Sequence, residues 1–288
     1  PAAAEAMAAA YRDAPGNPSA LGKPGRAAAR ELRRARERLA RLLGVKPEVV
    51  VFTSGGTEAI GLALLGTLGE RGRGHVVTSA IEHPAVLGSL KILERRGLEV
   101  SRVRPEPSGV VDPERFADAV TDRTVAACLM HVNNEIGTLQ PVAEVFAAVK
   151  ARAPRCLTFV DAVQSFTRVA VEPKPWQADL VALSGHKVGG PRGIGALVVL
   201  GRRPEPLLGG GDQEQRMRPG TENVPGAVGF VAAAQQKLGQ LDERLAHAAE
   251  LAGVFTSELA GRVPSAWING DPARRTDFIL SVSVPGLP

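Results

Sequence analysis

A lysine follows one of the most apolar segments of this 288-residue chain. Four consecutive apolar residues, Leu180–Leu183, indicate a strand buried on both faces, and Ser184-Gly-His-Lys187 follows it directly. An ammonium group at the end of a buried strand is partly desolvated, which disfavours its charged form and leaves the amine available as a nucleophile. Such a lysine can form a Schiff base with a carbonyl compound, so Lys187 is the first candidate catalytic residue.

A glycine turn follows another apolar segment and has the composition of a phosphate site. The turn is Thr53-Ser-Gly-Gly-Thr57, and an apolar helical pattern begins directly after it. Free backbone N–H groups at the start of a helix, together with hydroxyls, bind phosphate oxygens. The turn has neither the Gly-Lys-Ser/Thr sequence of a P-loop nor a dinucleotide fingerprint, so it predicts a phosphate cradle of another type.

Polar residues follow three further strand-like segments. Asp161 ends one of them, where a buried carboxylate is costly unless it meets a cation or a strong hydrogen-bond donor. His83 follows the second, and the polar run His131–Gly137 follows the third. Ligands of open α/β sheets bind beyond the carboxyl ends of the strands, which is where all these residues are expected to lie.

A phosphate cradle, a buried carboxylate and a buried lysine together meet the needs of pyridoxal 5′-phosphate. Its phosphate needs donors at a helix terminus, its pyridinium nitrogen needs an acid that keeps it protonated, and its aldehyde needs an amine. A metal hydrolase is a rival that would use His83, His131, His186 and Asp161, but no His-Glu-x-x-His or other tight ligand pair occurs. A kinase would need the lysine and acids in another arrangement, and its loop motif is missing. Pyridoxal phosphate is therefore the predicted cofactor, and no metal site is predicted.

Seven apolar segments supply the strands that must position these residues. The first several are separated by helix-length segments, which predicts a mostly parallel sheet covered on both faces. Between Leu183 and Ala196 the chain is too short for a crossover helix, so the last two strands are predicted to be antiparallel. The predicted fold is thus a three-layer α/β domain with a mostly parallel seven-stranded sheet and one antiparallel strand. The segments are Val49–Thr53, His75–Ser79, Glu99–Arg104, Thr124–Met130, Cys156–Val160, Leu180–Leu183 and Ala196–Leu200.

The two ends of the chain show other patterns. An alanine-rich N-terminal segment predicts a short helix that packs with a smaller domain. One long helix is predicted from about Pro225 to about Ala260, and Phe278–Val284 is predicted to be a strand. These last elements indicate the start of a smaller α+β domain. The predicted division is an N-terminal segment 1–14, a large cofactor-binding domain 15–228, and a linking helix with an incomplete small domain 229–288.

Composition and charge limit the class of protein. No apolar run approaches the ~20 residues of a transmembrane helix, the first residues lack a signal-peptide pattern, and two cysteines make no disulfide framework. We therefore expect a cytoplasmic protein without membrane contact. Eight basic residues lie in a predicted amphipathic helix over 22–44, within a chain of net charge +5. A solvated helix face accounts for them better than an acidic partner or RNA, and no nucleic-acid-binding motif accompanies them.

The sequences around these strand ends resemble those of cysteine desulfurases of the NifS/IscS type. These enzymes are a branch of the fold-type-I pyridoxal-phosphate enzymes, within the class V aminotransferase superfamily. The matches occur in the order and spacing of the family over nearly the whole chain. They are Gly16-Asn-Pro-Ser19, Phe52-Thr-Ser-Gly-Gly-Thr-Glu-Ala59, Glu82-His83, Met130-His-Val-Asn-Asn-Glu-Ile-Gly137, Val160-Asp-Ala-Val-Gln-Ser165, Ser184-Gly-His-Lys187 and Arg218-Pro-Gly-Thr-Glu-Asn223.

The resemblance implies a role for each residue around the cofactor ring. Lys187 would hold the cofactor covalently and later act as the proton-transfer base. Asp161 would bind the pyridine nitrogen, and Gln164 the ring hydroxyl. His83 would stack on the ring and move protons, and Asn134 would contact cofactor or substrate.

The resemblance also implies a phosphate site and a homodimer. Thr221 would reach the phosphate of the cofactor in the other subunit. Within one subunit, the phosphate would be held by Gly56, Thr57, Ser184 and His186.

The implied reaction removes sulfur from L-cysteine and leaves L-alanine and an enzyme persulfide, whose sulfur passes to an acceptor protein such as an iron–sulfur scaffold or a thiolation partner. The family's sulfur-accepting cysteine is expected on a loop beyond residue 288. Cys128 and Cys156 lie in predicted strands, and we expect both to be buried packing residues. The alternatives are a selenocysteine lyase or an aminotransferase of the same superfamily, and a pyridoxal-phosphate-binding scaffold without desulfurase activity.

Overall fold

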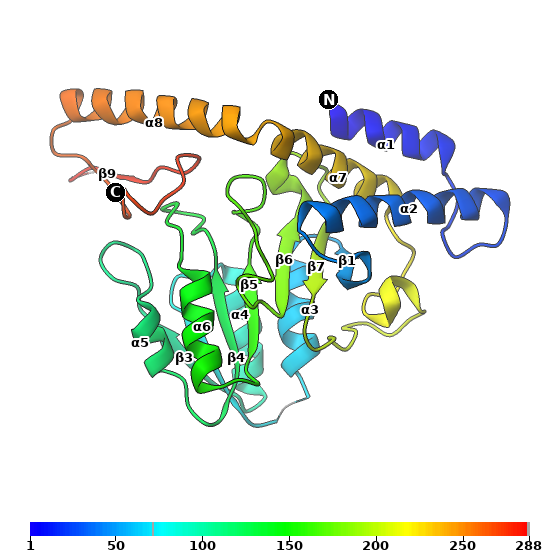
Figure 1. The fold of residues 1–288 in the computed structure, drawn as a ribbon, viewed down its shortest axis with the longest axis horizontal. Coiled ribbons are helices and arrows are strands. Elements are labelled where there is room, and N and C mark those ends of the chain that lie inside the picture. The colour runs from blue at the N-terminus through cyan, green and yellow to red at the C-terminus, as the bar shows by residue number, and fades with distance from the viewer. Residues whose placement is uncertain (71, 287–288) are drawn as a thin grey trace.

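A computed structural model describes residues 1–70 and 72–286, and its main feature is a seven-stranded sheet (Figure 1). The strand order is β1-β7-β6-β5-β4-β2-β3. Strand β7 is antiparallel to both neighbours, and the other adjacent pairs are parallel. The strands are β1 (Val50–Thr53), β2 (His75–Ser79), β3 (Glu99–Val103), β4 (Thr124–Met130), β5 (Leu157–Asp161), β6 (Leu180–Ser184) and β7 (Gly195–Val199).

The predicted sheet is confirmed in strand number, direction and position. Each predicted strand end lies within one residue of the observed end. Every residue of β1, β2, β5, β6 and β7 is buried, which explains why β1, β6 and β7 are mainly apolar runs rather than alternating patterns. The antiparallel β6–β7 pair follows from the short connection, which leaves no room for a crossover.

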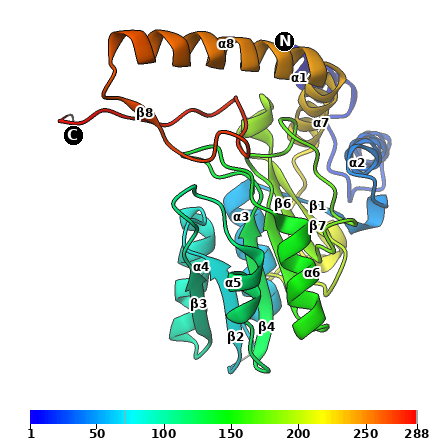
Figure 2. The same cartoon turned by 60° about the vertical axis from the view of Figure 1, so that its left-hand side comes forward.

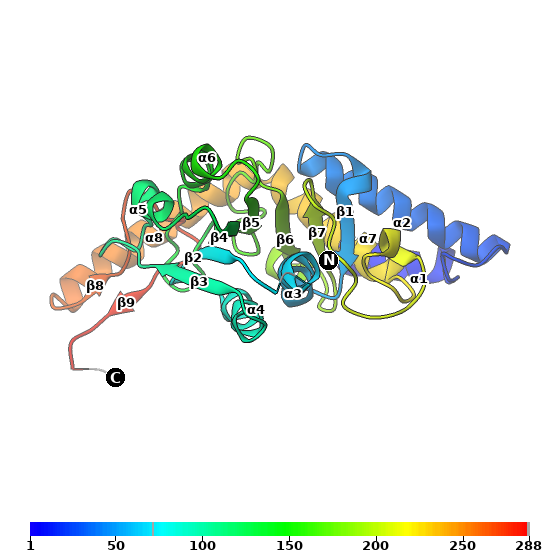
Figure 3. The ribbon, with the colours of Figure 1, turned by 90° about the horizontal axis from the view of Figure 1, so that it is seen from below.

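Helices cover both faces of the sheet and make it the middle of three layers. Viewed from below, α3 and α4 lie on one side and α5 and α6 on the other (Figure 3). Ile60 and Leu90 belong to the core on the first side, and Leu39, Phe146 and Phe230 to the core on the second. The helices involved are α2 (Lys23–Leu42), α3 (Gly56–Leu68), α4 (Pro84–Arg95), α5 (Pro113–Asp118), α6 (Val142–Arg152) and α7 (Val224–Gly239). Single 3-10 turns occur at η1 (Pro47–Val49), η2 (Gly185–Val188) and η3 (Gln213–Arg216).

The arginine-rich helix α2 is amphipathic as predicted, with one exception. Its apolar residues Leu32 and Leu39 are buried, and Gly44 follows the helix with φ +63°, a backbone conformation that favours glycine. Arg36 turns inward and pairs with the buried Glu214. The other basic side chains of the segment are exposed, namely Lys23, Arg26, Arg30, Arg33, Arg34, Arg38 and Arg41.

The prediction of one unbroken helix after Pro225 is wrong. The segment forms α7 and a second helix, α8 (Leu241–Arg262), which continues across the molecule in Figure 1. Between them Gln240 has φ −115° and ψ 19°, which is not helical, and it follows Gly239, a weak helix former. Arg244 stabilises the break because its guanidinium donates to the carbonyl oxygens of Lys237 (3.1 Å) and Thr167 (2.8 Å).

The predicted strand Phe278–Val284 is mostly wrong. Only β9 (Val282–Ser283) is a strand, and it pairs antiparallel with β8 (Trp267–Ile268) in the extended segment seen below α8 in Figure 2. The residues just before it bond to the loop after β4 instead of to a sheet. The Leu139 N–H donates to Arg274 O (2.8 Å), and the Thr276 N–H donates to Gly137 O (2.9 Å). Within the predicted strand, the N–H groups of Phe278 and Ile279 donate to Thr276 Oγ1 (3.4 Å) and O (3.3 Å), which forms a turn instead of a strand.

The first helix, α1 (Ala2–Asp13), packs along α7. The contact is close at Gly229, where an added Cβ would lie 2.6 Å from Met7 Cγ. The division into 1–14, 15–228 and 229–288 stays a prediction, and its last two residues lie outside the described part of the chain. Within residues 1–70 and 72–286, no helix has both the length and the apolar character needed to cross a bilayer.

Candidate active site

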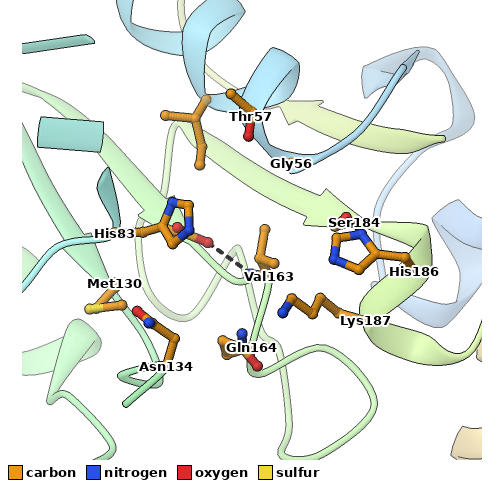
Figure 4. Close-up of a pocket in the computed structure, with 12 residues that line it drawn as sticks. Gly56, Thr57, His83, Met130, Asn134, Val163, Gln164, Ser184, His186 and Lys187 are labelled. Atoms are coloured by element: carbon orange, nitrogen blue, oxygen red, sulfur yellow. Dashed lines mark hydrogen bonds between the residues drawn. The ribbon is translucent and has the colours of Figure 1, made fainter. Parts of the chain in front are cut away.

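One cavity gathers almost all of the predicted site residues (Figure 4). It has a volume of about 180 Å³ and lies at the carboxyl ends of the parallel strands β4, β5 and β6. Nine of the ten predicted residues line it: Gly56, Thr57, His83, Asn134, Asp161, Gln164, Ser184, His186 and Lys187. The sequence did not single out Ile60, Met130 and Val163, which complete the lining and for which only their positions next to strand or helix ends gave a signal.

Lys187 lies in η2, the single turn that follows strand β6. Its side chain is half-buried, and its amine points into the cavity in Figure 4. Among the described residues it forms no ion pair. The turn ends at Gly189, whose φ of +76° lets the chain reverse directly after the lysine. This arrangement leaves an amine free to meet a carbonyl group in the cavity.

The start of helix α3 forms the second wall of the cavity. Gly56 and Thr57 are its first two residues, so their N–H groups have no partner within the helix. A Cβ on Gly56 would lie 2.8 Å from Val163 Cγ2 and 3.3 Å from Ser184 Cβ, so only glycine fits there. Ser184 Oγ lies 2.9 Å from Nδ1 of His186. These groups form a cradle for an anion, next to the positive end of the helix dipole.

Asp161 is a buried carboxyl at the end of β5. Its Oδ1 accepts from the Val163 N–H (2.9 Å), and it has no ion pair among the described residues. Burial raises the pKa of Asp161, whereas the Val163 hydrogen bond and the nearby His83 act in the opposite direction. A carboxylate in this position is stabilised by a cationic N–H donor in the cavity. Gln164 lines the cavity beside it, and its side-chain oxygen accepts from Arg168.

The opposite wall of the cavity consists of two loops joined by a hydrogen bond, and these loops carry His83 and Asn134. His83 is the N-cap of α4, and its Nδ1 accepts from the Ala85 N–H (3.1 Å). The Asn133 side chain donates to Ile81 O (3.1 Å), so the loop after β4 is bonded to the loop after β2. Asn133 Oδ1 also accepts from Glu135 and Ile136 N–H. The ring of His83 and the amide of Asn134 are thereby held on neighbouring, cross-linked loops.

Glu82 joins the same two loops and was not predicted as a functional residue. Its Oε1 accepts from Ser79 Oγ (2.5 Å) and from the Met130 N–H (2.9 Å), and its Oε2 is buried without a partner among the described residues. Burial is the main cause that raises the pKa of Glu82 to about 8, and the nearby Asp161 adds to it. The sequence signal was similar to that of Asp161, because Glu82 is an acid three residues after the end of a buried strand.

Thr221 and His131 lie apart from the cavity. Thr221 is exposed on the loop before α7 and does not line the cavity of its own chain. His131 is buried against Trp176, with ring centroids 4.5 Å apart, and burial lowers its pKa to about 4. The metal-ligand set considered above is therefore not assembled, and the described residues contain no group of three or more His, Cys, Asp or Glu side chains suited to a metal.

Both cysteines are buried, as predicted. Cys128 in β4 is 0% exposed and Cys156, just before β5, is 1% exposed. Burial raises the pKa of the Cys128 thiol well above its ordinary value and that of Cys156 to about 12. Neither thiol is positioned or ionised as a sulfur acceptor needs to be.

Comparison with known proteins identifies the family. The sequence profile of the family described as aminotransferase class-V matches residues 1–287. The chain is 39% identical over 287 residues to a cysteine desulfurase of Gluconacetobacter diazotrophicus, covering 98% of this chain and 71% of that protein. This chain belongs to the cysteine desulfurases of the class-V aminotransferase family. It is also 35% identical to the cysteine desulfurase IscS of Dictyoglomus turgidum, covering 94% of this chain and 69% of the relative, and 37% identical to that of Methanosarcina thermophila, covering 90% and 64%.

Solved structures of the family share the fold. A NifS-like protein superposes with a TM-score of 0.94 at 34% identity, covering 99% of this chain and 78% of that one. DndA from Streptomyces lividans gives a TM-score of 0.85 at 36% identity, covering 96% and 78%. A third structure, SspA in complex with cysteine, gives 0.77 at 36% identity and covers 81% and 68%. The fold-type-I architecture expected from the sequence is therefore confirmed.

Proposed function

We propose that this desulfurase-family chain binds pyridoxal 5′-phosphate and takes sulfur from L-cysteine. The observation that carries the proposal is the single cavity that brings together Lys187, Asp161 and the α3 cradle. The residues present fit this cofactor. Asp161 is a buried carboxyl without an ion pair among the described residues, which suits a cationic ring nitrogen. The cradle at Gly56 has no room for a Cβ, which suits a closely bound phosphate. When bound, pyridoxal phosphate supplies an electron sink for bonds at the substrate Cα.

Each residue of the cavity has one task in this proposal. Lys187 would hold the cofactor and would move protons at the substrate carbon atoms. Asp161 would keep the ring nitrogen protonated, and Gln164 would bond the ring hydroxyl. His83 would stack on the ring and move a proton. Asn134 orients cofactor or substrate, while the phosphate-binding group Gly56, Thr57, Ser184 and His186 fixes the other end.

The overall reaction conserves atoms and electrons. The Cβ–S bond of L-cysteine breaks, its sulfur forms an S–S bond with an acceptor thiolate, and Cβ gains a proton to give L-alanine. The acceptor thiol becomes a persulfide. Since Cys128 and Cys156 are buried, we propose that the acceptor is a thiol other than these two, either a protein cysteine or a free thiol. We propose an iron–sulfur scaffold or a thiolation protein as the final recipient, and a homodimer in which the exposed Thr221 reaches the second copy.

Replacement of Lys187 tests the proposal most directly. Lys187→Ala is expected to abolish the yellow, borohydride-reducible absorbance that the wild-type protein gains with pyridoxal phosphate. The matched control is Lys91→Ala, which removes an exposed lysine on α4 and leaves the absorbance unchanged. Unaltered absorbance in Lys187→Ala would show that the cofactor is not held there.

A second candidate is a scaffold that binds the cofactor without desulfurase activity, and the two inert cysteines favour it. Alanine and sulfide release from cysteine, with dithiothreitol as the acceptor, separates the two. Comparison of cysteine, selenocysteine and keto acids as substrates distinguishes a selenocysteine lyase and an aminotransferase. Persulfide labelling on Cys128 or Cys156 would overturn the assignment of both as packing residues.

A further inference from the structure

Strand β1 is an edge strand whose outer side is bonded by two side chains. It pairs only with β7 in the sheet of the described residues, so alternate backbone groups point outward. Glu214 Oε2 accepts from the outward Phe52 N–H (2.8 Å), and the Arg36 guanidinium donates to the outward Val50 carbonyl (2.5 Å). The two side chains therefore take the place of a neighbouring strand.

Arg36 and Glu214 also bind each other. Both guanidinium nitrogens lie 2.6 Å from the two carboxylate oxygens, which is a bidentate pair. The Glu214 side chain is 1% exposed and that of Arg36 15%, and the guanidinium carbon lies 5.0 Å from the centre of the Phe52 ring. A buried pair of this kind adds little net stability, but it defines where its two elements lie.

Glu214 holds an otherwise strained loop, which spans residues 209–223. Glu214, Gln215 and Arg216 all have positive φ angles, 44°, 59° and 69°, which are unfavourable for residues other than glycine. The buried Met217 follows. Three such residues in a row persist only where other contacts fix the loop, and the Arg36–Glu214 pair is the buried charged contact that does so.

The same loop places a cation beside the phosphate cradle. Arg218 Nε lies 2.9 Å from Oε1 of Glu58, which is in the first turn of α3 directly after Gly56 and Thr57. The other oxygen of Glu58 accepts from the Ser54 N–H (2.6 Å). Although burial works in the opposite direction, the bonds from Arg218 and Ser54 hold the pKa of Glu58 below its ordinary value. Without Arg218, this carboxylate is an unpaired negative charge beside a bound phosphate.

We propose that Arg36 and Glu214 are positioning residues that hold Arg218 against Glu58 and thereby maintain affinity for the phosphate end of the cofactor. This inference rests on the proposed function. Arg36 on α2 pairs with Glu214 in the 209–223 loop. Arg218 in the same loop pairs with Glu58, which lies next to the cradle in the first turn of α3. Neither Arg36 nor Glu214 lines the cavity, so they act on it indirectly, through Arg218 on the 209–223 loop and through their bonds to β1.

Binding of pyridoxal 5′-phosphate and of pyridoxal, which lacks the phosphate, tests the inference. Glu214→Gln is expected to weaken the phosphorylated form about tenfold and to change pyridoxal binding by less than about twofold, because the lost interaction is charge-assisted and acts at the phosphate end. The control Glu31→Gln disrupts the exposed Arg34–Glu31 pair on the same helix and changes neither. Dissociation constants come from absorbance titrations, and far-UV circular dichroism checks the fold.

A second substitution distinguishes positioning from general loosening. Glu58→Gln in the Glu214→Gln background removes the unpaired charge and is expected to restore affinity for the phosphorylated form to within about threefold of wild type. The inference would be overturned if Glu214→Gln weakened binding of both ligands equally or of neither. It would also be overturned if Glu58→Gln failed to restore affinity for pyridoxal 5′-phosphate. If Glu214→Gln does not fold, Arg36→Lys replaces it, since this variant keeps the charge but not the bidentate pair. The same two results are then expected: a larger loss of affinity for pyridoxal 5′-phosphate than for pyridoxal, and recovery of that affinity on adding Glu58→Gln. Wild-type protein that binds neither ligand would refute the proposed function, and this inference with it.

Discussion

Glu82→Gln changes the charge of the site without changing its shape, and its effect on stability depends on pH. The glutamine oxygen can still accept from Ser79 Oγ and the Met130 N–H, which Glu82 Oε1 accepts in the native protein. Glutamine cannot titrate. The difference between the two proteins as pH changes therefore reports the proton on Glu82 alone.

The sign and size follow from the raised pKa of Glu82, about 8 in the folded protein against an ordinary 4.5. Between these values the folded state holds a proton that the unfolded state releases, so the contribution of this group to stability falls as pH rises. Each pH unit well inside that window costs about 1.4 kcal/mol in the free energy of unfolding. Because Glu82 is already half ionised at pH 8, we expect a loss of about 2 kcal/mol between pH 6 and pH 8 in the wild type. The Glu82→Gln variant lacks this loss.

Urea unfolding of both proteins at pH 6, 7 and 8 measures this difference. All other titrating groups are common to both proteins, so their effects cancel. Glu82→Gln is expected to gain stability relative to wild type with rising pH, whatever its absolute stability at pH 6. Infrared absorption gives an independent check, since a protonated carboxyl band should disappear in the variant. If the free energies of unfolding of the two proteins changed in parallel from pH 6 to 8, to within about 0.5 kcal/mol, Glu82 would be ionised throughout this range and its pKa would not be raised.

Three further perturbations address the cradle, the thiols and the core. Gly56→Ala is expected to weaken pyridoxal phosphate binding at least about tenfold in absorbance titrations, because its Cβ would lie 2.8 Å from Val163 Cγ2; binding within about twofold of wild type would contradict the cradle. Cys128 and Cys156 are expected to resist iodoacetamide at pH 8 in the folded protein and to react in urea, as followed by mass spectrometry, because their pKa values are raised by burial. Phe230→Ala is expected to cost about 3–5 kcal/mol in urea unfolding, since its ring lies on the buried face of α7 against Phe166, and a cost below about 1 kcal/mol would contradict that packing.

The sequence predicted the sheet and the cavity well because both depend on short-range patterns. A buried parallel strand is a run of apolar residues, and its end is marked by the first polar residue, as at Asp161 and Ser184. Once the strands are parallel, geometry alone brings those ends to one edge of the sheet. The strand ends therefore indicated Lys187, Asp161, His83 and the turn before α3, and the family resemblance supplied the other residues of the nine that line the cavity.

The features that the sequence did not predict depend on contacts between distant parts of the chain, which no local sequence pattern indicates. The break at Gln240 depends on Arg244 reaching back to the end of α7, and the segment before β9 is held through Arg274 and Thr276 by the loop after β4. Arg36 belongs by composition to a solvated face, yet its partner Glu214 lies 178 residues further along the chain. Pairings of this length are set by the tertiary fold, and a single sequence does not reveal them.

Under the proposed function, Glu82 and Asp161 together would make the cavity selective for a cationic ring. Both carboxyls are buried at ends of strands in the same sheet, and burial raises the pKa of each. A negative charge on Asp161 makes ionisation of Glu82 more costly still. Under the proposed function, a cationic N–H donor beside Asp161 would stabilise one negative charge and leave no second cation for Glu82. The proton would then stay on Glu82, which bonds the Met130 N–H, while Asp161 would ionise against the ligand. The two acids would differ in charge because only Asp161 lines the cavity.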